Sequence, residues 1–183
     1  MRQCREFEIA FVGLETGSHV YEYRIEDKFF ITYDEQDFED CIANIKLSLE
    51  KNAGFLQLKF DIDGTLKVAC DRCGNTLPMQ LWDEFNIIVK MVDDPEVMNE
   101  QEEDPDVYYI SRGESHLHLA DWIYEFINLQ VPYKVVHPDD ENGQPTCNPE
   151  VLKKLKELQA DTNKKTDNAD PRWDALKNLY NKN

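Results

Sequence analysis

Apolar and polar side chains alternate along much of the first half of the chain. The alternation is clear in residues 6–11, 20–25, 45–50 and 55–61. A period of two places successive side chains on opposite faces of a strand, so each stretch predicts a half-buried β-strand. Residues 52–54 contain Gly54 and predict a turn between the third and fourth strands, and a turn near residues 13–18 would join the first two.

The next predicted turn contains a glycine. Asp63-Gly64 is typical of a two-residue hairpin, because such a turn needs a residue that tolerates a positive φ. Residues 66–69 would return from that turn, and residues 79–92 and 107–110 would add two more strands. The pattern therefore predicts an antiparallel meander of about six strands that could curl toward a barrel.

The hydrophobic period changes after residue 110. Apolar residues recur at helical spacing and predict an amphipathic helix that ends near Pro132: Leu119, Trp122, Ile123, Phe126 and Ile127. Asn148 followed by Pro149 is a typical helix start, and Asp170-Pro171 is another. The fold class is therefore predicted to be α+β, with a sheet followed by three helices.

The domain organisation follows from these elements. We expect residues 1–148 to form a β-rich core domain and residues 149–183 a helical segment that packs on it within the same domain. The apolar stripe of the first C-terminal helix would be Val151, Leu152, Leu155 and Leu158. In the last helix, Trp173 and Tyr180 would lie on the apolar face.

Composition narrows the classes of function. The 183 residues include 20 Lys and Arg against 37 Asp and Glu, which gives a net charge of −17, and 41% are hydrophobic. Such a chain can build a core, but it lacks the basic excess needed to coat DNA or to dock on anionic lipid. No apolar run approaches a membrane span and no secretory signal stands at the start, so we expect a cytoplasmic protein.

Charge is distributed unevenly. Residues 93–106 hold eight acidic residues, no Lys or Arg, and two prolines, and they predict an acidic loop. Residues 149–183 hold eight basic and six acidic residues. A mildly basic end permits limited contact with RNA even though the whole chain is acidic.

The strongest local motif is Cys70-Asp71-Arg72-Cys73-Gly74. Two thiolates at this spacing in a turn can face one metal ion, and Cys147 and His137 could complete a Cys3His zinc site. The alternative is that these are reduced cysteines in a tight turn, with no metal. Five cysteines at sparse spacing do not resemble a disulfide framework, and Cys4 and Cys41 are most simply packing residues.

A second motif is His116-Leu117-His118, with Asp121 close behind it. Two histidines and a carboxylate could bind a catalytic metal, so a metal-dependent hydrolase is one hypothesis. The alternative is that the three residues only lead into the helix that follows. No glycine-rich phosphate loop or nucleophile elbow is present in the sequence.

The basic end of the chain offers candidate RNA contacts: Lys153, Lys154, Lys156, Lys164, Lys165, Arg172, Lys177 and Lys182. Trp173 and Tyr180 could stack on a base. Alternatively, the lysines form a solvated helix face and the two aromatic rings are buried.

Taken in order, several motifs resemble one family. They are Cys70-Asp71-Arg72-Cys73, residues 126–132, His137-Pro138-Asp139, Thr146-Cys147 and residues 170–176. From about residue 5 to its end, the chain resembles the YceD-like family of large ribosomal RNA subunit accumulation proteins, also called domain of unknown function 177. Many relatives have a richer cysteine cluster after the helix, where this chain has only His137 and Cys147.

The resemblance implies a non-enzymatic, bacterial-type ribosome-biogenesis factor that supports 23S rRNA accumulation and large-subunit assembly. Its partners would be 23S rRNA or its precursor and large-subunit assembly proteins, with no DNA and no membrane. We expect RNA contact through Arg72, Lys153, Lys154, Lys164, Lys165 and Arg172. The alternative is an adaptor that binds a ribosomal or assembly protein through its acidic surface.

Overall fold

The computed structural model describes residues 4–33 and 35–162. The chain divides into two compact units, Met1–Val135 and Val136–Asn183, which are described in turn. The predicted helix at Pro171, with Trp173 and Tyr180, lies outside the described residues. No helix among the described residues is long and apolar enough to cross a membrane.

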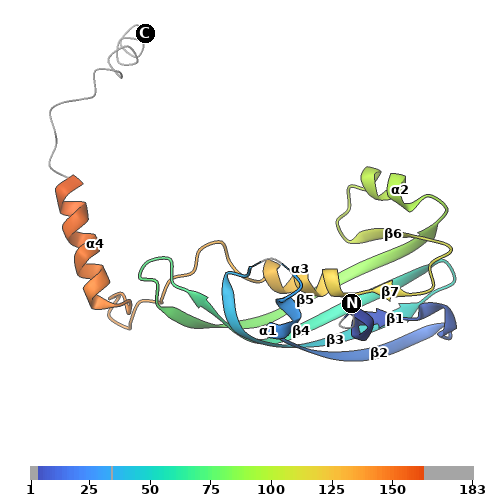
Figure 1. Ribbon diagram of the computed structural model, residues 1–183, viewed down its shortest axis with the longest axis horizontal. Helices are drawn as coiled ribbons and strands as arrows, with labels where there is room; N and C mark the ends of the chain where they lie inside the picture. Colours follow the sequence, from blue (N-terminus) through green and yellow to red (C-terminus); the bar gives the residue numbers. More distant parts are fainter. Residues whose placement is uncertain (1–3, 34, 163–183) are drawn as a thin grey trace, which may run out of the picture. The chain divides into compact units, whose positions relative to one another are not determined.

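A five-stranded sheet dominates the first unit (Figure 1). Its order is β2 (Gly17–Glu26), β3 (Phe38–Lys51), β4 (Phe55–Ala69), β5 (Thr76–Val92) and β6 (Val107–Ser111). Neighbouring strands are antiparallel except for β5 and β6, which are parallel. The α+β prediction is confirmed; the sheet stays open, with β2 and β6 at its edges, so it is not a barrel.

The predicted alternation explains which face of the sheet is buried. On β3 and β4 every second side chain is nearly inaccessible, and the side chains between them are mostly solvated. The buried row on β4 is Leu56, Leu58, Phe60, Ile62, Leu66 and Val68. The antiparallel turn at residues 52–54 is confirmed, since Asn52 N–H donates to Phe55 O at 3.0 Å.

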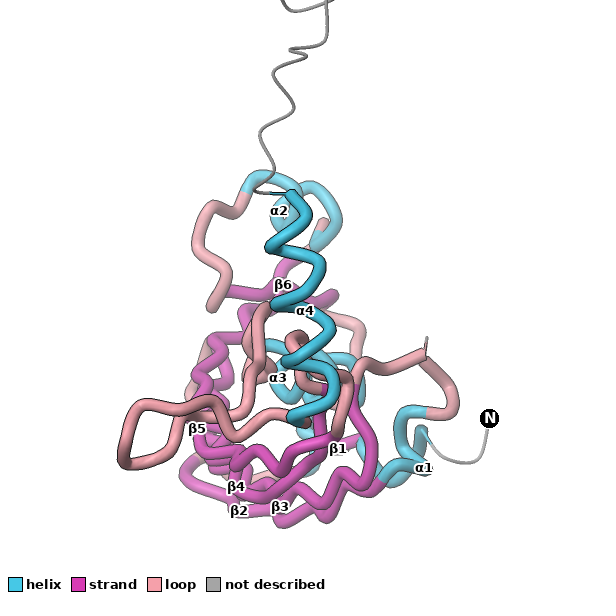
Figure 2. Tube along the Cα trace, turned by 90° about the vertical axis from the view of Figure 1, so that its left-hand side faces the viewer, coloured by secondary structure: helices cyan, strands magenta, loops and turns pink. Residues whose placement is uncertain are grey.

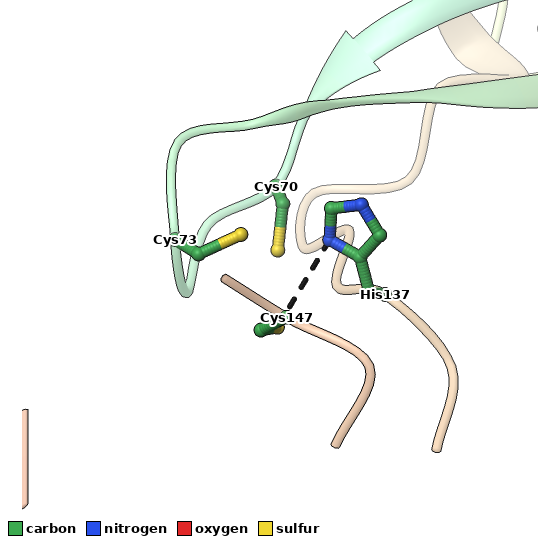
Figure 3. A group of neighbouring side chains, drawn as sticks. All are labelled: Cys70, Cys73, His137 and Cys147. Carbon is green, nitrogen blue, oxygen red and sulfur yellow. Dashed lines mark hydrogen bonds between the residues drawn. The ribbon is translucent and has the colours of Figure 1, made fainter. Parts of the chain in front are cut away.

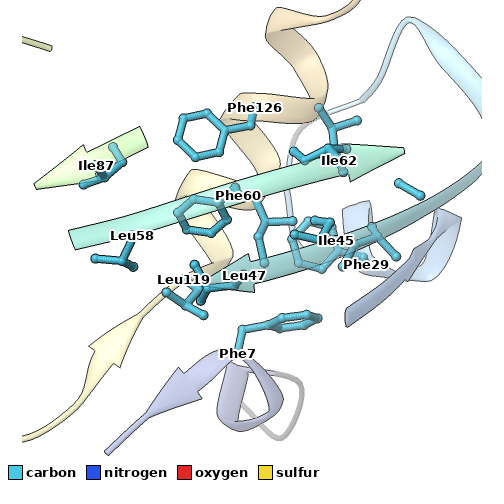
Figure 4. Close-up of a cluster of buried hydrophobic side chains, with 14 of the residues drawn as sticks. Phe7, Phe29, Ile45, Leu47, Leu58, Phe60, Ile62, Ile87, Leu119 and Phe126 are labelled. Carbon is cyan, nitrogen blue, oxygen red and sulfur yellow. The ribbon is translucent and has the colours of Figure 1, made fainter. Parts of the chain in front are cut away.

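Short elements cover the buried face (Figures 2 and 4). The helix α3 (Ala120–Leu129) places Phe126 5.1 Å from the ring of Phe60 and 4.3 Å, stacked, from that of Phe85. The other elements on this face are α1 (Asp27–Phe30), the 3-10 turns η1 (Cys4–Phe7) and η2 (Phe11–Gly13), and a two-stranded sheet of β1 (Glu8–Ile9) and β7 (Leu117–His118). The predicted amphipathic helix is confirmed in α3.

The predicted turn at Asp63-Gly64 is wrong, because β4 runs without a break through both residues. Gly64 has φ +150 and lies opposite the irregular part of β3, where the register shifts between Glu39 and Ile42. A Cβ at residue 64 would collide with Ile42 O and lie 2.8 Å from Ala43 Cα. This glycine therefore allows a close approach of two strands and does not end one.

The first predicted strand is shorter than expected, and it does not pair with β2. Of residues 6–11, only β1 is a strand, and it is antiparallel to β7. Phe7, Ile9 and Phe11 all point into the core, so the alternating pattern reflects burial of 3-10 turns as well as of a strand. Lys51 Nζ donates to the carbonyls of residues 11, 12 and 14 at 2.9, 3.2 and 2.8 Å, which fixes the turn at η2.

Part of the predicted acidic loop is helical. The helix α2 (Pro95–Gln101) lies within residues 93–106 and precedes β6. Asn99 accepts the N–H of Tyr109 at 2.8 Å and donates to its carbonyl at 2.9 Å, and Tyr109 OH donates to Glu102 at 2.7 Å. The last of these bonds lowers the pKa of Glu102 and raises that of Tyr109. Hydrogen bonds to Tyr109 of β6 therefore hold α2 in place. The hydrophobic pattern of the sequence gives no indication of these bonds.

The second unit contains a short loop and the helix α4 (Pro149–Thr162). The predicted start of α4 is confirmed: Glu150 N–H donates to Asn148 Oδ1 at 3.0 Å, and Leu152 N–H donates to Asn148 O at 3.0 Å. Lys153 and Lys154 are exposed on this helix. Leu155 and Leu158 are also exposed, at 36% and 66%.

Candidate metal centre

The turn between β4 and β5 holds the first two cysteines. Cys70 directly follows β4, and its carbonyl accepts the N–H groups of Cys73 at 3.2 Å and Gly74 at 2.8 Å. Gly74 has φ +75, which a glycine adopts without strain and which closes the turn. Cys70 is buried and Cys73 is half-buried. The local sequence therefore builds the turn that the C-x-x-C spacing predicted.

Asp71 holds this turn in place, a role that the sequence reasoning missed. Its N–H donates to Val135 O at 2.8 Å, and its carboxylate accepts the N–H of Val135 at 2.6 Å. Both bonds connect the C-x-x-C turn to the chain just before His137. The only sign of this role in the sequence is an Asp inside the C-x-x-C turn. The residue that it bonds, Val135, lies 64 residues away in the sequence.

The loop from His137 to Cys147 folds back on itself. Asp140 Oδ1 accepts the N–H groups of Asn142 at 2.9 Å and Gln144 at 2.7 Å, while Thr146 donates its hydroxyl to Pro138 O at 2.6 Å. These bonds bring the two ends of the loop together. Cys147 Sγ lies 3.9 Å from His137 Nδ1 as a result.

The four predicted ligands form one group (Figure 3). One donor atom from each of Cys70, Cys73, His137 and Cys147 lies within 4.8 Å of the other three. In a tetrahedral zinc site, bonds of about 2.0–2.3 Å put neighbouring donors roughly 3.5–3.8 Å apart. A contraction of about an ångström at the widest pair would therefore be enough to enclose an ion.

The donor set fits a structural zinc ion. Three sulfurs and one imidazole nitrogen would fill all four positions of a tetrahedral site and would leave none open for water or substrate. Cys41 differs from the three cysteines of the group because it is buried in the core, outside the group. Burial raises the pKa of its thiol to about 12, and the charge of Asp27 adds to this effect. Its predicted packing role agrees with that environment.

The residues of the second motif contact three different partners. His118 Nδ1 lies 3.6 Å from Glu8, and His116 Nδ1 lies 2.8 Å from Ser115 Oγ. Asp121 accepts the Tyr33 hydroxyl at 3.0 Å. Among residues 4–33 and 35–162, the cysteine and histidine group alone brings three or more donors together, so the geometry does not support the metal-dependent hydrolase.

The predicted RNA-binding residues are only partly described. Lys153 and Lys154 are exposed on α4, and Arg72 is half-buried in the C-x-x-C turn. Lys164, Lys165 and Arg172 lie outside the described residues.

A family model described as "Large ribosomal RNA subunit accumulation protein YceD" matches residues 58–180. The chain belongs to the YceD family. The matched range contains the whole cysteine and histidine group and all of α4. The family description links this YceD member to accumulation of the large-subunit ribosomal RNA. No curated protein and no solved structure matches the chain.

Proposed function

We propose that the protein is a non-enzymatic, cytoplasmic ribosome-biogenesis factor that supports 23S rRNA accumulation by binding rRNA or a pre-ribosomal particle. The family match carries this proposal. The test is depletion of the protein followed by profiling of ribosomal precursors. We expect less 23S rRNA and fewer large subunits, whereas normal levels of both would contradict the proposal.

The proposed RNA contact lies on α4. Lys153 and Lys154 are exposed there, and no ion pair involving either of them is found among the described residues. Unpaired lysines neutralise phosphate and release counterions, which makes RNA binding depend on salt. The acidic character of the chain would confine that contact to this end.

Charge reversal tests the contact. The Lys153→Glu/Lys154→Glu variant should bind pre-ribosomal RNA more weakly and with a shallower salt dependence, measured by filter binding over a salt series. The matched control is Arg24→Glu/Lys46→Glu, which makes the same change of charge at exposed positions on β2 and β3. Equal binding by both variants and the unchanged protein would exclude α4 as the contact.

We further propose that Cys70, Cys73, His137 and Cys147 hold one zinc ion with a structural role. Zinc would cross-link the C-x-x-C turn to the loop that ends at Cys147 and would supply folding free energy. Ligand thiols must be deprotonated to bind, so binding should release protons and weaken at low pH.

Metal analysis tests the zinc site. We expect about one zinc ion per chain in protein purified without chelator, and a loss of zinc in the Cys73→Ser and Cys147→Ser variants. The control is Cys41→Ala, because Cys41 is a cysteine that lies outside the group. Cobalt substitution should give the absorption of tetrahedral thiolate ligation. Unchanged zinc content in the Cys73→Ser variant, or no metal in the unchanged protein, would overturn the assignment.

A further inference from the structure

A cavity lies on the first unit beside β6 and α3, and none of its lining residues belongs to the cysteine and histidine group. Its volume is about 580 Å³, within the range of roughly 300–1,000 Å³ that is usual for ligand sites. Residues of α2, β6, the segment before α3 and α3 itself line it. These elements belong to one compact unit, so the cavity is built into that unit.

Carboxylates dominate the charge of the cavity. Glu96 on α2, Glu114 after β6 and Glu125 on α3 line it, and none has an ion-pair partner among the described residues. No Lys or Arg is among the lining residues, all of which the structure describes. The cavity therefore presents uncompensated negative charge from three separate elements.

Aromatic rings form part of the wall. Tyr108 and Trp122 are edge to face with their centroids 5.4 Å apart, and Tyr108 is 44% exposed. The face of an aromatic ring attracts a cation, so rings and carboxylates favour the same kind of ligand. An Arg or Lys side chain also has an apolar stem that can pack on such rings.

Two other occupants fit less well. The lining carboxylates and histidines do not bring three donors close enough for a metal ion. An added β-strand would need the outward backbone groups of β6, but the Asn99 side chain already bonds the N–H and the carbonyl of Tyr109. RNA is disfavoured because the carboxylates would repel its phosphates.

We propose that this cavity binds Arg or Lys side chains of an unstructured basic segment of a partner protein. Charge complementarity carries the assignment: the cavity offers carboxylates and aromatic faces, and a basic segment supplies cations on apolar stems. The inference goes beyond the proposed contact with RNA, because it uses a different surface and the opposite charge. If the protein failed to bind RNA, binding of a basic segment in this cavity would still be expected.

The test uses the full chain and a blocked peptide of alternating arginine and serine, followed by NMR. We expect saturable shifts of the Trp122 indole and of the β6 amides. The Glu96→Gln/Glu114→Gln/Glu125→Gln variant should bind the peptide at least about tenfold more weakly. The matched control, Glu15→Gln/Glu22→Gln/Glu50→Gln, removes the same charge from exposed positions elsewhere and should bind normally.

Four outcomes would overturn the proposal. Equal weakening in the control variant would indicate general attraction to an acidic chain. Equally tight binding of free spermidine would assign the cavity to a small polyamine. Shifts of the cavity resonances with protein concentration alone would indicate a second copy of the chain. Changes of these resonances in a Lys164→Glu/Lys165→Glu variant, without peptide, would indicate the chain's own C-terminal segment.

Discussion

Replacing Gly64 by alanine tests the close approach of β3 and β4. The residue lies inside β4 with φ +150, a conformation that L-residues rarely adopt. Its new methyl group would meet the carbonyl oxygen of Ile42 and the Cα of Ala43. Both obstacles are backbone atoms of β3, so no side-chain rotation can relieve the clash.

The cost has two parts. Holding a non-glycine residue in this backbone region costs about 1–3 kcal/mol, and overpacking a tight contact costs about 1–3 kcal/mol. Allowing for partial relaxation, we expect Gly64→Ala to lower the free energy of unfolding by about 2–4 kcal/mol. A typical domain has only about 5–15 kcal/mol in total, so the loss should be large.

Urea unfolding followed by circular dichroism measures this cost through the shift of the midpoint. Gly54→Ala is the control, because Gly54 has a negative φ and no atom within 4 Å of an added Cβ. It should change the free energy of unfolding by less than about 1 kcal/mol. If the two variants unfold at the same urea concentration, the account of Gly64 is refuted.

Three further predictions concern the core, η2 and one phenol. Phe126→Ala should lower the free energy of unfolding by about 3–5 kcal/mol because it removes a ring packed on two others, and Phe126→Leu should cost much less in the same urea assay. Lys51→Met should cost about 1–2 kcal/mol by leaving three carbonyls without their donor, while Lys46→Met at an exposed position should be near neutral. Burial raises the pKa of Tyr23 to about 12, and the nearby Tyr21 and Glu6 add to this effect. The neutral Tyr23 phenol therefore contributes fully to the free energy of unfolding below about pH 10, and this contribution is lost as the pH rises to about 12. The urea midpoint should fall over that interval less steeply in Tyr23→Phe, and parallel profiles would contradict this.

Elements with a strong hydrophobic period could be predicted from the sequence. The strands β3 and β4 alternate because one face is buried, and α3 shows its apolar stripe because that stripe packs on Phe60 and Phe85. Pairing was harder to predict. Residues 6–11 alternate like a strand, but nothing local shows that β1 would pair with β7 and not with β2.

Glycine and polar contacts account for the other errors. Asp63-Gly64 has the composition of a turn, and only the position of β3 shows that the glycine is needed for space. The helix α2 depends on Asn99 and Glu102, whose partner Tyr109 is on another element. The cysteine and histidine group was predictable because its donor types are rare in the chain, whereas Asp71 needed a partner that only the fold supplies.

The pairing of β1 with β7 has a consequence for synthesis. The four strands β2 to β5 pair in chain order, so each can join the sheet soon after it leaves the ribosome. Glu8, by contrast, pairs with His118, and joining such distant residues closes a long loop at an entropic cost. The residues of β1 are made before the five-stranded sheet but are therefore expected to dock after it. The part of the core that Phe7 and Ile9 cover stays open to water until β7 has emerged.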